Sequence, residues 1–163
     1  MVLGMSLATF TLVHVFISII GIASGLIVME RLVRNRALGL SNTIFLVTTI
    51  ATSVTGFLFP FKGFTPAQAF GVISLVVLAV ALFALYAGNL IGAWRWIYVI
   101  TAVMALYLNV FVGVVQAFTK VGRLRMLAPT QTEPPFALTQ AAVLLFFLVV
   151  AVIALRRFRP PTL

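Results

Sequence analysis

The stretch WIYVITAVMALYLNVFVGVVQAFT, residues 96–119, decides the fold class of this chain. It runs for 24 residues without Asp, Glu, Lys or Arg. About 20 apolar residues in an α-helix span the hydrocarbon core of a bilayer. Lipid offers no partners to backbone polar groups, so such a run must form a helix or part of a closed β-barrel. Barrel strands would alternate in polarity over about 10 residues. This stretch does not alternate, so we predict a transmembrane helix.

Four further runs without a charged residue lie elsewhere along the chain, at 1–29, 37–61, 63–94 and 134–155. The chain is 63% hydrophobic and 8% charged, whereas soluble domains carry about 25% charged residues. We therefore predict an all-α, polytopic integral membrane helix bundle that forms a single transmembrane domain over residues 1–163. Its five transmembrane helices are expected at about 7–29, 40–60, 66–87, 94–118 and 137–155, with an outer loop at 118–136.

The basic residues indicate the orientation of the bundle, because loops on the cytoplasmic side are enriched in Lys and Arg. Five helices with the N-terminus outside and the C-terminus inside place seven basic residues inside: Arg31, Arg34, Arg36, Arg95, Arg156, Arg157 and Arg159. Four remain outside: Lys62, Lys120, Arg123 and Arg125. A four-helix alternative, with 40–60 lying in the membrane interface, also places seven basic residues on one side and four on the other. The length of the uncharged run 37–61 favours five helices.

Several classes of function are disfavoured by composition. The formal charge of +9 falls in short clusters and not along one face, so we expect contact with membrane lipids and not with nucleic acid. Cysteine is absent, and Glu30 and Glu133 are the only acids, which disfavours thiolate, zinc-thiolate and paired-carboxylate chemistry. The sequence requires no cofactor or metal.

Small size, the arginine bias and the lack of a targeting segment suggest the bacterial cytoplasmic membrane.

Polar side chains recur at one depth of the predicted bundle. Asn109 and Gln116 are seven residues apart, so they lie on the same face of their helix. Asn109 and His14 would lie about 10–13 Å below the outer surface, and Thr52 and Thr55 come from the same layer. We expect these five residues to line a ligand site or a pore. The same layer also contains Ser53, Gln68, Ser74 and Gln140. The alternative is that the amides only hold helices together.

Small residues and interfacial residues predict how the helices pack. Gly21 and Gly25 form a G-x-x-x-G motif, which permits close contact between membrane helices, and they continue a stripe that begins at His14. We favour packing within one chain over dimerisation. Trp94, Arg95 and Trp96 are expected to anchor a helix end at the membrane interface.

Charged pairs are predicted near both ends of the bundle. Glu30 and Arg34 are spaced for an i, i+4 ion pair. Glu133 is expected to pair with Arg123 or Arg125 in the outer loop.

Two classes of function remain open. The first is a binding or interaction bundle that holds a lipid-like or quinone-like ligand, or docks to a larger membrane complex. The second is an oligomeric channel or transporter for a small solute, lined by His14, Asn109 and Gln116. A membrane enzyme is disfavoured, because the acids, cysteines and histidines that such chemistry needs are scarce.

Overall fold

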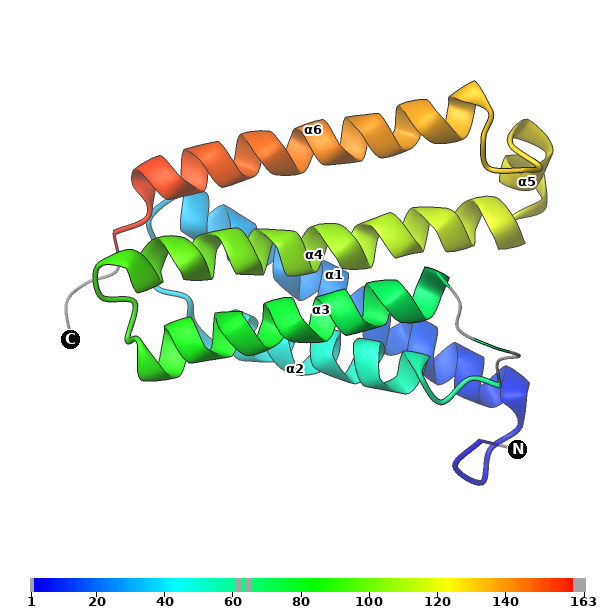
Figure 1. Cartoon of the computed structure of the whole chain (residues 1–163), viewed down its shortest axis with the longest axis horizontal. Coiled ribbons are helices and arrows are strands. Elements are labelled where there is room, and N and C mark those ends of the chain that lie inside the picture. The colour runs from blue at the N-terminus through cyan, green and yellow to red at the C-terminus, as the bar shows by residue number, and fades with distance from the viewer. Residues whose placement is uncertain (1, 61–62, 64–65, 160–163) are drawn as a thin grey trace.

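The computed structural model of the chain describes residues 2–60, 63 and 66–159, and its regular elements are helices (Figure 1). Their bounds are α1 Leu7–Val33, α2 Gly39–Gly56, α3 Pro66–Leu82, the π-helical turn η1 Phe83–Ala87, α4 Ala93–Lys120, α5 Gly122–Leu127 and α6 Pro134–Arg157. The predicted all-α fold is therefore confirmed.

Among the described residues, four helices are long and apolar enough to cross a membrane: α1, the continuous segment of α3 and η1, α4 and α6. The chain is a membrane helix bundle with four candidate spans, where the sequence analysis predicted five. The difference is α2, which ends at Gly56 and not at Pro60. Its 18 residues extend about 27 Å, and seven of them are Ser or Thr. Length and composition therefore do not establish α2 as a span.

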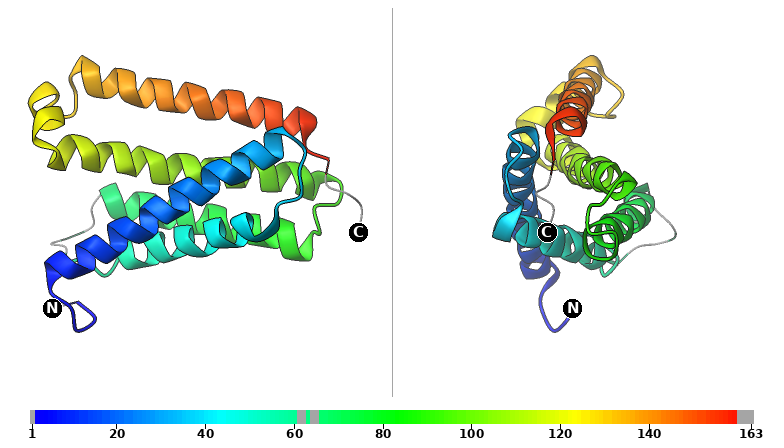
Figure 2. Two further views of the ribbon diagram at one scale, coloured as in Figure 1. Left: turned by 180° about the vertical axis from the view of Figure 1, so that it is seen from behind. Right: turned by 90° about the vertical axis from the view of Figure 1, so that its left-hand side faces the viewer.

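The long helices run back and forth along the bundle, so the two termini lie at opposite ends (Figure 1). Helix α2 runs beside α3, and α1 crosses behind them and packs on both α2 and α4. Helix α6 lies at the edge of the bundle, mainly against α4, as the end-on view in Figure 2 shows. Helices α1, α2, α3 and α4 therefore surround a shared interior.

The apolar core occupies the half of the bundle where α1 ends and α4 begins. Alanines and a glycine at these contacts, such as Gly25, Ala102 and Ala105, are buried and allow the helices to approach closely. The other half holds fewer buried side chains and contains the candidate site. The largest fully buried members of the core are Val28, Leu32, Phe45, Leu46, Leu78, Tyr98, Val99, Leu106 and Phe158.

Polar contacts tie the helices together at the core end. The hydroxyl of Tyr98 on α4 donates a hydrogen bond to Oδ1 of Asn42 on α2, and both side chains are buried. The predicted ion pair is confirmed, since Nε of Arg34 lies 3.0 Å from a carboxylate oxygen of Glu30. Arg36 lies 3.5 Å from the same oxygen.

The residues predicted as interfacial anchors take different positions. Trp94 packs on Phe83, with ring centroids 4.9 Å apart, whereas Trp96 is exposed. The Arg95 guanidinium lies 5.4 Å from the Trp96 ring centroid and also donates a hydrogen bond to the Phe158 carbonyl. Arg95 therefore binds the segment that follows α6.

The connection between α4 and α6 differs from the loop predicted at 118–136. Helix α4 continues to Lys120, α5 follows, and α6 begins at Pro134. Glu133 does not pair with Arg123 or Arg125. Its carboxylate accepts hydrogen bonds from the backbone and hydroxyl of Thr130 and from the backbone of Thr132. Desolvation acts to raise the pKa of Glu133, but these hydrogen bonds outweigh it and lower the pKa. Lys62 lies outside the described residues.

Candidate functional site

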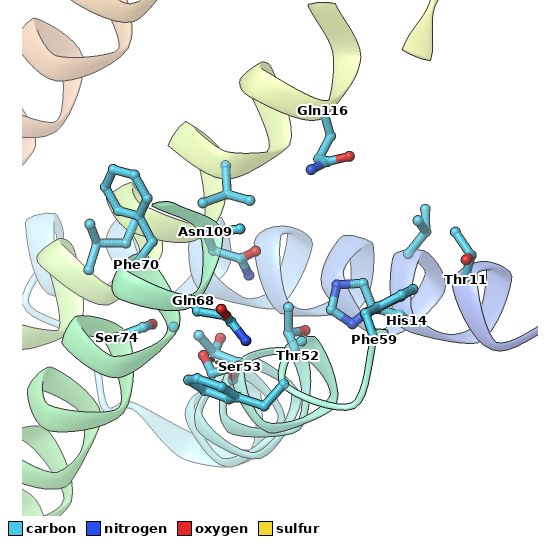
Figure 3. A pocket seen from close by; sticks show the side chains of 18 of the residues that line it. Thr11, His14, Thr52, Ser53, Phe59, Gln68, Phe70, Ser74, Asn109 and Gln116 are labelled. Carbon is cyan, nitrogen blue, oxygen red and sulfur yellow. Dashed lines mark hydrogen bonds between the residues drawn. The ribbon is translucent and has the colours of Figure 1, made fainter. Parts of the chain in front are cut away.

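A cavity of about 430 Å³ lies among α1, α2, α3 and α4, in the half of the bundle that includes the start of α1 (Figure 3). Its volume is within the range of about 300–1,000 Å³ that is typical of small-molecule sites. Its polar wall residues are Thr11, His14, Thr49, Thr52, Ser53, Gln68, Ser74, Asn109, Gln116 and Lys120. Its apolar wall includes Leu7, Val15, Phe57, Phe59, Phe70, Leu108 and Val112.

The cavity exists because the helices that face it carry small side chains. Helix α2 presents Ser, Thr and Gly56 to it, and α3 presents Ala67, Gly71 and Ser74. At Gly71 the ring of Phe57 lies so close that an added Cβ would be 2.9 Å from its Cζ atom. The phenylalanine therefore closes the side of the cavity without filling it. The same short hydroxyl side chains that lower the hydropathy of α2 thus create the space.

His14 is the only histidine of the chain, and its hydrogen bond identifies its tautomer. Its Nδ1 lies 2.8 Å from Oγ1 of Thr55. The Thr55 hydroxyl donates its one hydrogen to the Ala51 carbonyl at 2.7 Å. With that hydrogen on the Ala51 carbonyl, Thr55 accepts from His14, and we therefore assign the proton of the neutral ring to Nδ1. Phe59 packs edge-on against the imidazole, with ring centroids 5.2 Å apart. In the neutral ring, Nε2 remains as an acceptor.

Replacing Thr55 with valine is expected to lower the ratio of the Nδ1-protonated to the Nε2-protonated tautomer of His14 about threefold, because a hydrogen bond between membrane helices contributes about 0.6 kcal/mol. Heteronuclear NMR can report this, since one histidine gives one set of ring signals. Thr11→Val is the matched control, because the Thr11 hydroxyl bonds to the Leu7 carbonyl. Equal tautomer populations in wild type and Thr55→Val would contradict the assignment.

Two buried polar atoms on the cavity wall have no hydrogen-bond partner among the described residues. They are Nδ2 of Asn109 and Oγ1 of Thr49, whose side chain is 1% exposed. A buried polar group without a partner costs about 1–3 kcal/mol. Room for the amide comes from Gly21, where an added Cβ would lie 3.2 Å from the Asn109 Nδ2. These two atoms are the buried hydrogen-bonding groups of the cavity-lining residues that no described residue satisfies.

The structure brings four of the five predicted site residues to this cavity: His14, Thr52, Asn109 and Gln116. The fifth, Thr55, lies behind His14 as its hydrogen-bond partner. Asn109 and Gln116 extend from the same side of α4 (Figure 3). Within the described part of the chain, neither amide forms a hydrogen bond to another helix. The arrangement therefore favours a lining role for both over a role in holding helices together.

Other residues show what the sequence analysis missed. Gln140 was expected in the same polar layer, but its Nε2 donates to the Phe111 carbonyl, and it does not line the cavity. Thr49 and Lys120 line the cavity and were not predicted. The spacing of Thr49, Thr52, Ser53 and Gly56 on one face of α2 could have indicated Thr49.

The two glycines of the G-x-x-x-G motif face neighbouring helices of the same chain. Gly21 lies against Asn109 on α4 and Thr48 and Thr49 on α2. Gly25 lies against Leu106 and Phe45 on the same two helices. The motif therefore packs within one chain in this structure, against side chains of α2 and α4.

Comparison with protein-family models, with curated proteins and with solved structures finds no match to this chain.

Proposed function

We propose that this protein is a small integral membrane protein that binds a lipid-like or quinone-like amphipathic molecule in the cavity among its first four long helices. The observation that carries this proposal is the pair of unpartnered buried atoms, Asn109 Nδ2 and Thr49 Oγ1, on an otherwise largely apolar wall. Ligand sites typically combine an apolar lining with a few polar groups that orient the ligand. An amphipathic molecule matches both parts of this wall.

The proposal includes a five-span topology in which α2 also crosses the bilayer. Helix α2 runs beside α3 and not across the bundle (Figure 1), and its hydroxyls bond to backbone carbonyls one turn earlier. The described basic residues divide unevenly between the ends. Seven lie at the core end: Arg31, Arg34, Arg36, Arg95, Arg156, Arg157 and Arg159. Three lie at the cavity end: Lys120, Arg123 and Arg125.

This charge division supports a cytoplasmic core end, with the N-terminus outside and the C-terminus inside. The cavity then lies in the outer half of the membrane. A bacterial cytoplasmic membrane remains the proposed location. Homo-oligomers and docking to a larger membrane complex remain compatible with binding in the cavity.

Binding is favoured over permeation because the cavity ends against tightly packed apolar side chains. Thr49 and Asn109 line the cavity, and Phe45 and Leu106 lie about one helical turn from them toward the core; both are fully buried. Leu46 and Val99 continue this layer. A small polar solute would have to cross this layer to reach the other side. The alternative, an oligomeric channel lined by His14, Asn109 and Gln116, would therefore need a path past this layer, between chains of the oligomer.

Filling the cavity tests the proposal. Val112→Phe adds a ring to the cavity wall and is expected to lower the retained ligand at least tenfold, measured by native mass spectrometry of protein released from a mild detergent. Val149→Phe is the control, since Val149 is 50% exposed on α6, away from the cavity. Equal ligand retention in both variants would contradict binding in this cavity. Solute flux into liposomes that depends on pH and disappears in His14→Ala would favour the channel.

A further inference from the structure

The charged groups of the cavity wall restrict the kind of head group that it accepts. No acidic side chain is among the described residues that line it, and its one fixed cation is Lys120. Lys120 is exposed at the end of α4, so it lies at the end of the bundle and not in its interior. A positively charged head group would find no counter-ion in this cavity, while an anion would find one.

The N-terminus of α3 also favours a negative or electron-rich head group. The cavity lining includes Ala67 and Gln68 in the first turn of α3. The N-terminus of an α-helix carries the positive end of its dipole and favours negative charge or electron-rich oxygen. Since α3 has 17 residues, its dipole adds to the effect of Lys120.

The unpartnered buried atoms supply hydrogen-bond donors. Asn109 Nδ2 can only donate, and Thr49 Oγ1 can donate or accept. Both lack partners among the described residues. His14 offers one further hydrogen-bonding atom, Nε2, since its Nδ1 is bonded to Thr55. The Nε2 atom accepts a hydrogen bond when the ring is neutral and donates one when the ring is protonated. The buried part of the wall therefore has an unmet need for an acceptor.

We infer that the cavity selects an amphiphile whose head group is an uncharged or anionic oxygen acceptor, a carbonyl or a carboxylate, and excludes amphiphiles with cationic head groups. This inference rests on the proposed function and gives it a ligand class. The oxygen would accept from Asn109 Nδ2, and the apolar body would lie against Phe57, Phe70 and Leu108.

Three probes with the same tail and different head groups test the inference: dodecanoate, methyl dodecanoate and dodecyltrimethylammonium. Each is added at the same mole fraction to the protein in lipid nanodiscs, and the bound fraction is measured by native mass spectrometry. We expect the two oxygen probes to bind the wild type at least tenfold more tightly than the ammonium probe. Val112→Phe should abolish this binding, and Val149→Phe should preserve it.

Two variants test the roles of the donors. Asn109→Leu should weaken both oxygen probes about tenfold, the effect of losing a hydrogen bond in a site of this kind. Its unfolding midpoint should remain near that of wild type, because Asn109 Nδ2 has no partner to lose. Lys120→Gln distinguishes a carboxylate head group from a carbonyl head group. Weakened binding of dodecanoate alone supports a carboxylate ligand, and unchanged binding of both probes supports a carbonyl ligand.

The outcomes of these experiments distinguish failure of the inferred ligand class from failure of the proposed function. If the ammonium probe binds as tightly as the oxygen probes and Val112→Phe abolishes all three, the cavity binds amphiphiles but the inferred class is wrong. If Val112→Phe changes none of the three, both the inference and the proposed function are wrong. If Asn109→Leu binds the oxygen probes as wild type does, the assigned donor is overturned.

Discussion

Replacing Gly25 with alanine is expected to lower the free energy of unfolding by about 1–3 kcal/mol, the usual cost of overpacking a well-packed core. The new Cβ would lie 2.6 Å from Cδ1 of Leu106 and 2.9 Å from two ring carbons of Phe45. Both neighbours are fully buried, so neither can move without displacing others. The three helices α1, α2 and α4 meet at this point, and the strain would affect all of them.

Gly113→Ala is the matched control for this prediction. Its added Cβ would have only the Ile22 Cδ1 atom nearby, at 3.8 Å, an ordinary contact. Alanine is a better helix former than glycine by about 0.8–1 kcal/mol, so this variant should be neutral or stabilised. Denaturant unfolding of both variants in detergent measures the difference. Gly25→Ala could instead unfold at the wild-type midpoint while its dimer dissociates on dilution. That result would mean that the motif packs between chains.

Replacing Tyr98 with phenylalanine is expected to destabilise the core end of the bundle by about 1–3 kcal/mol, because Asn42 would keep a buried acceptor without its donor. Tyr98 is fully buried and Asn42 is 4% exposed, so water has little access to replace the lost hydroxyl. The bond joins α2 to α4. It is one of the few polar contacts that hold α2, the most polar long helix, inside the bundle.

A double-mutant cycle separates this bond from the packing around it. Combining Tyr98→Phe with Asn42→Leu should cost less than the two single changes together, with a coupling energy of about 0.6–1.7 kcal/mol. The measurement is again unfolding in detergent. Thr101→Val serves as a reference, since the Thr101 hydroxyl bonds to backbone carbonyls of its own helix. Strictly additive effects would show that the Tyr98–Asn42 bond contributes no stability.

The residue pattern alone was sufficient to predict the long helices. The uncharged run at 63–94 predicted a helix over 66–87, and α3 with η1 covers Pro66–Ala87. The segment predicted at 94–118 is α4, Ala93–Lys120. Such runs are informative because a backbone in lipid must bond within its own helix. The status of α2 was harder to predict, because it has only 18 residues and seven of them are Ser or Thr.

The depth of polar residues could also be estimated from the sequence, because each helical residue advances about 1.5 Å. This was enough to place His14, Thr52, Asn109 and Gln116 in one layer, and all four line the cavity. The depth of a residue in the bundle does not determine the direction in which its side chain points, however. Gln140 shares that layer, yet its side chain bonds to the backbone of α4 at Phe111 and does not line the cavity.

The sequence by itself therefore determined the fold class, the approximate extent of the long helices and the depth of the polar side chains. Only the tertiary structure decided which faces meet, which polar atoms find partners and where space remains. The physical reason is that lipid and the protein core are both apolar, so hydrophobic periodicity does not distinguish an inward face of a membrane helix from an outward one. Contacts such as Gly25 against Phe45 and Leu106 depend on complementary shapes of helices far apart in sequence.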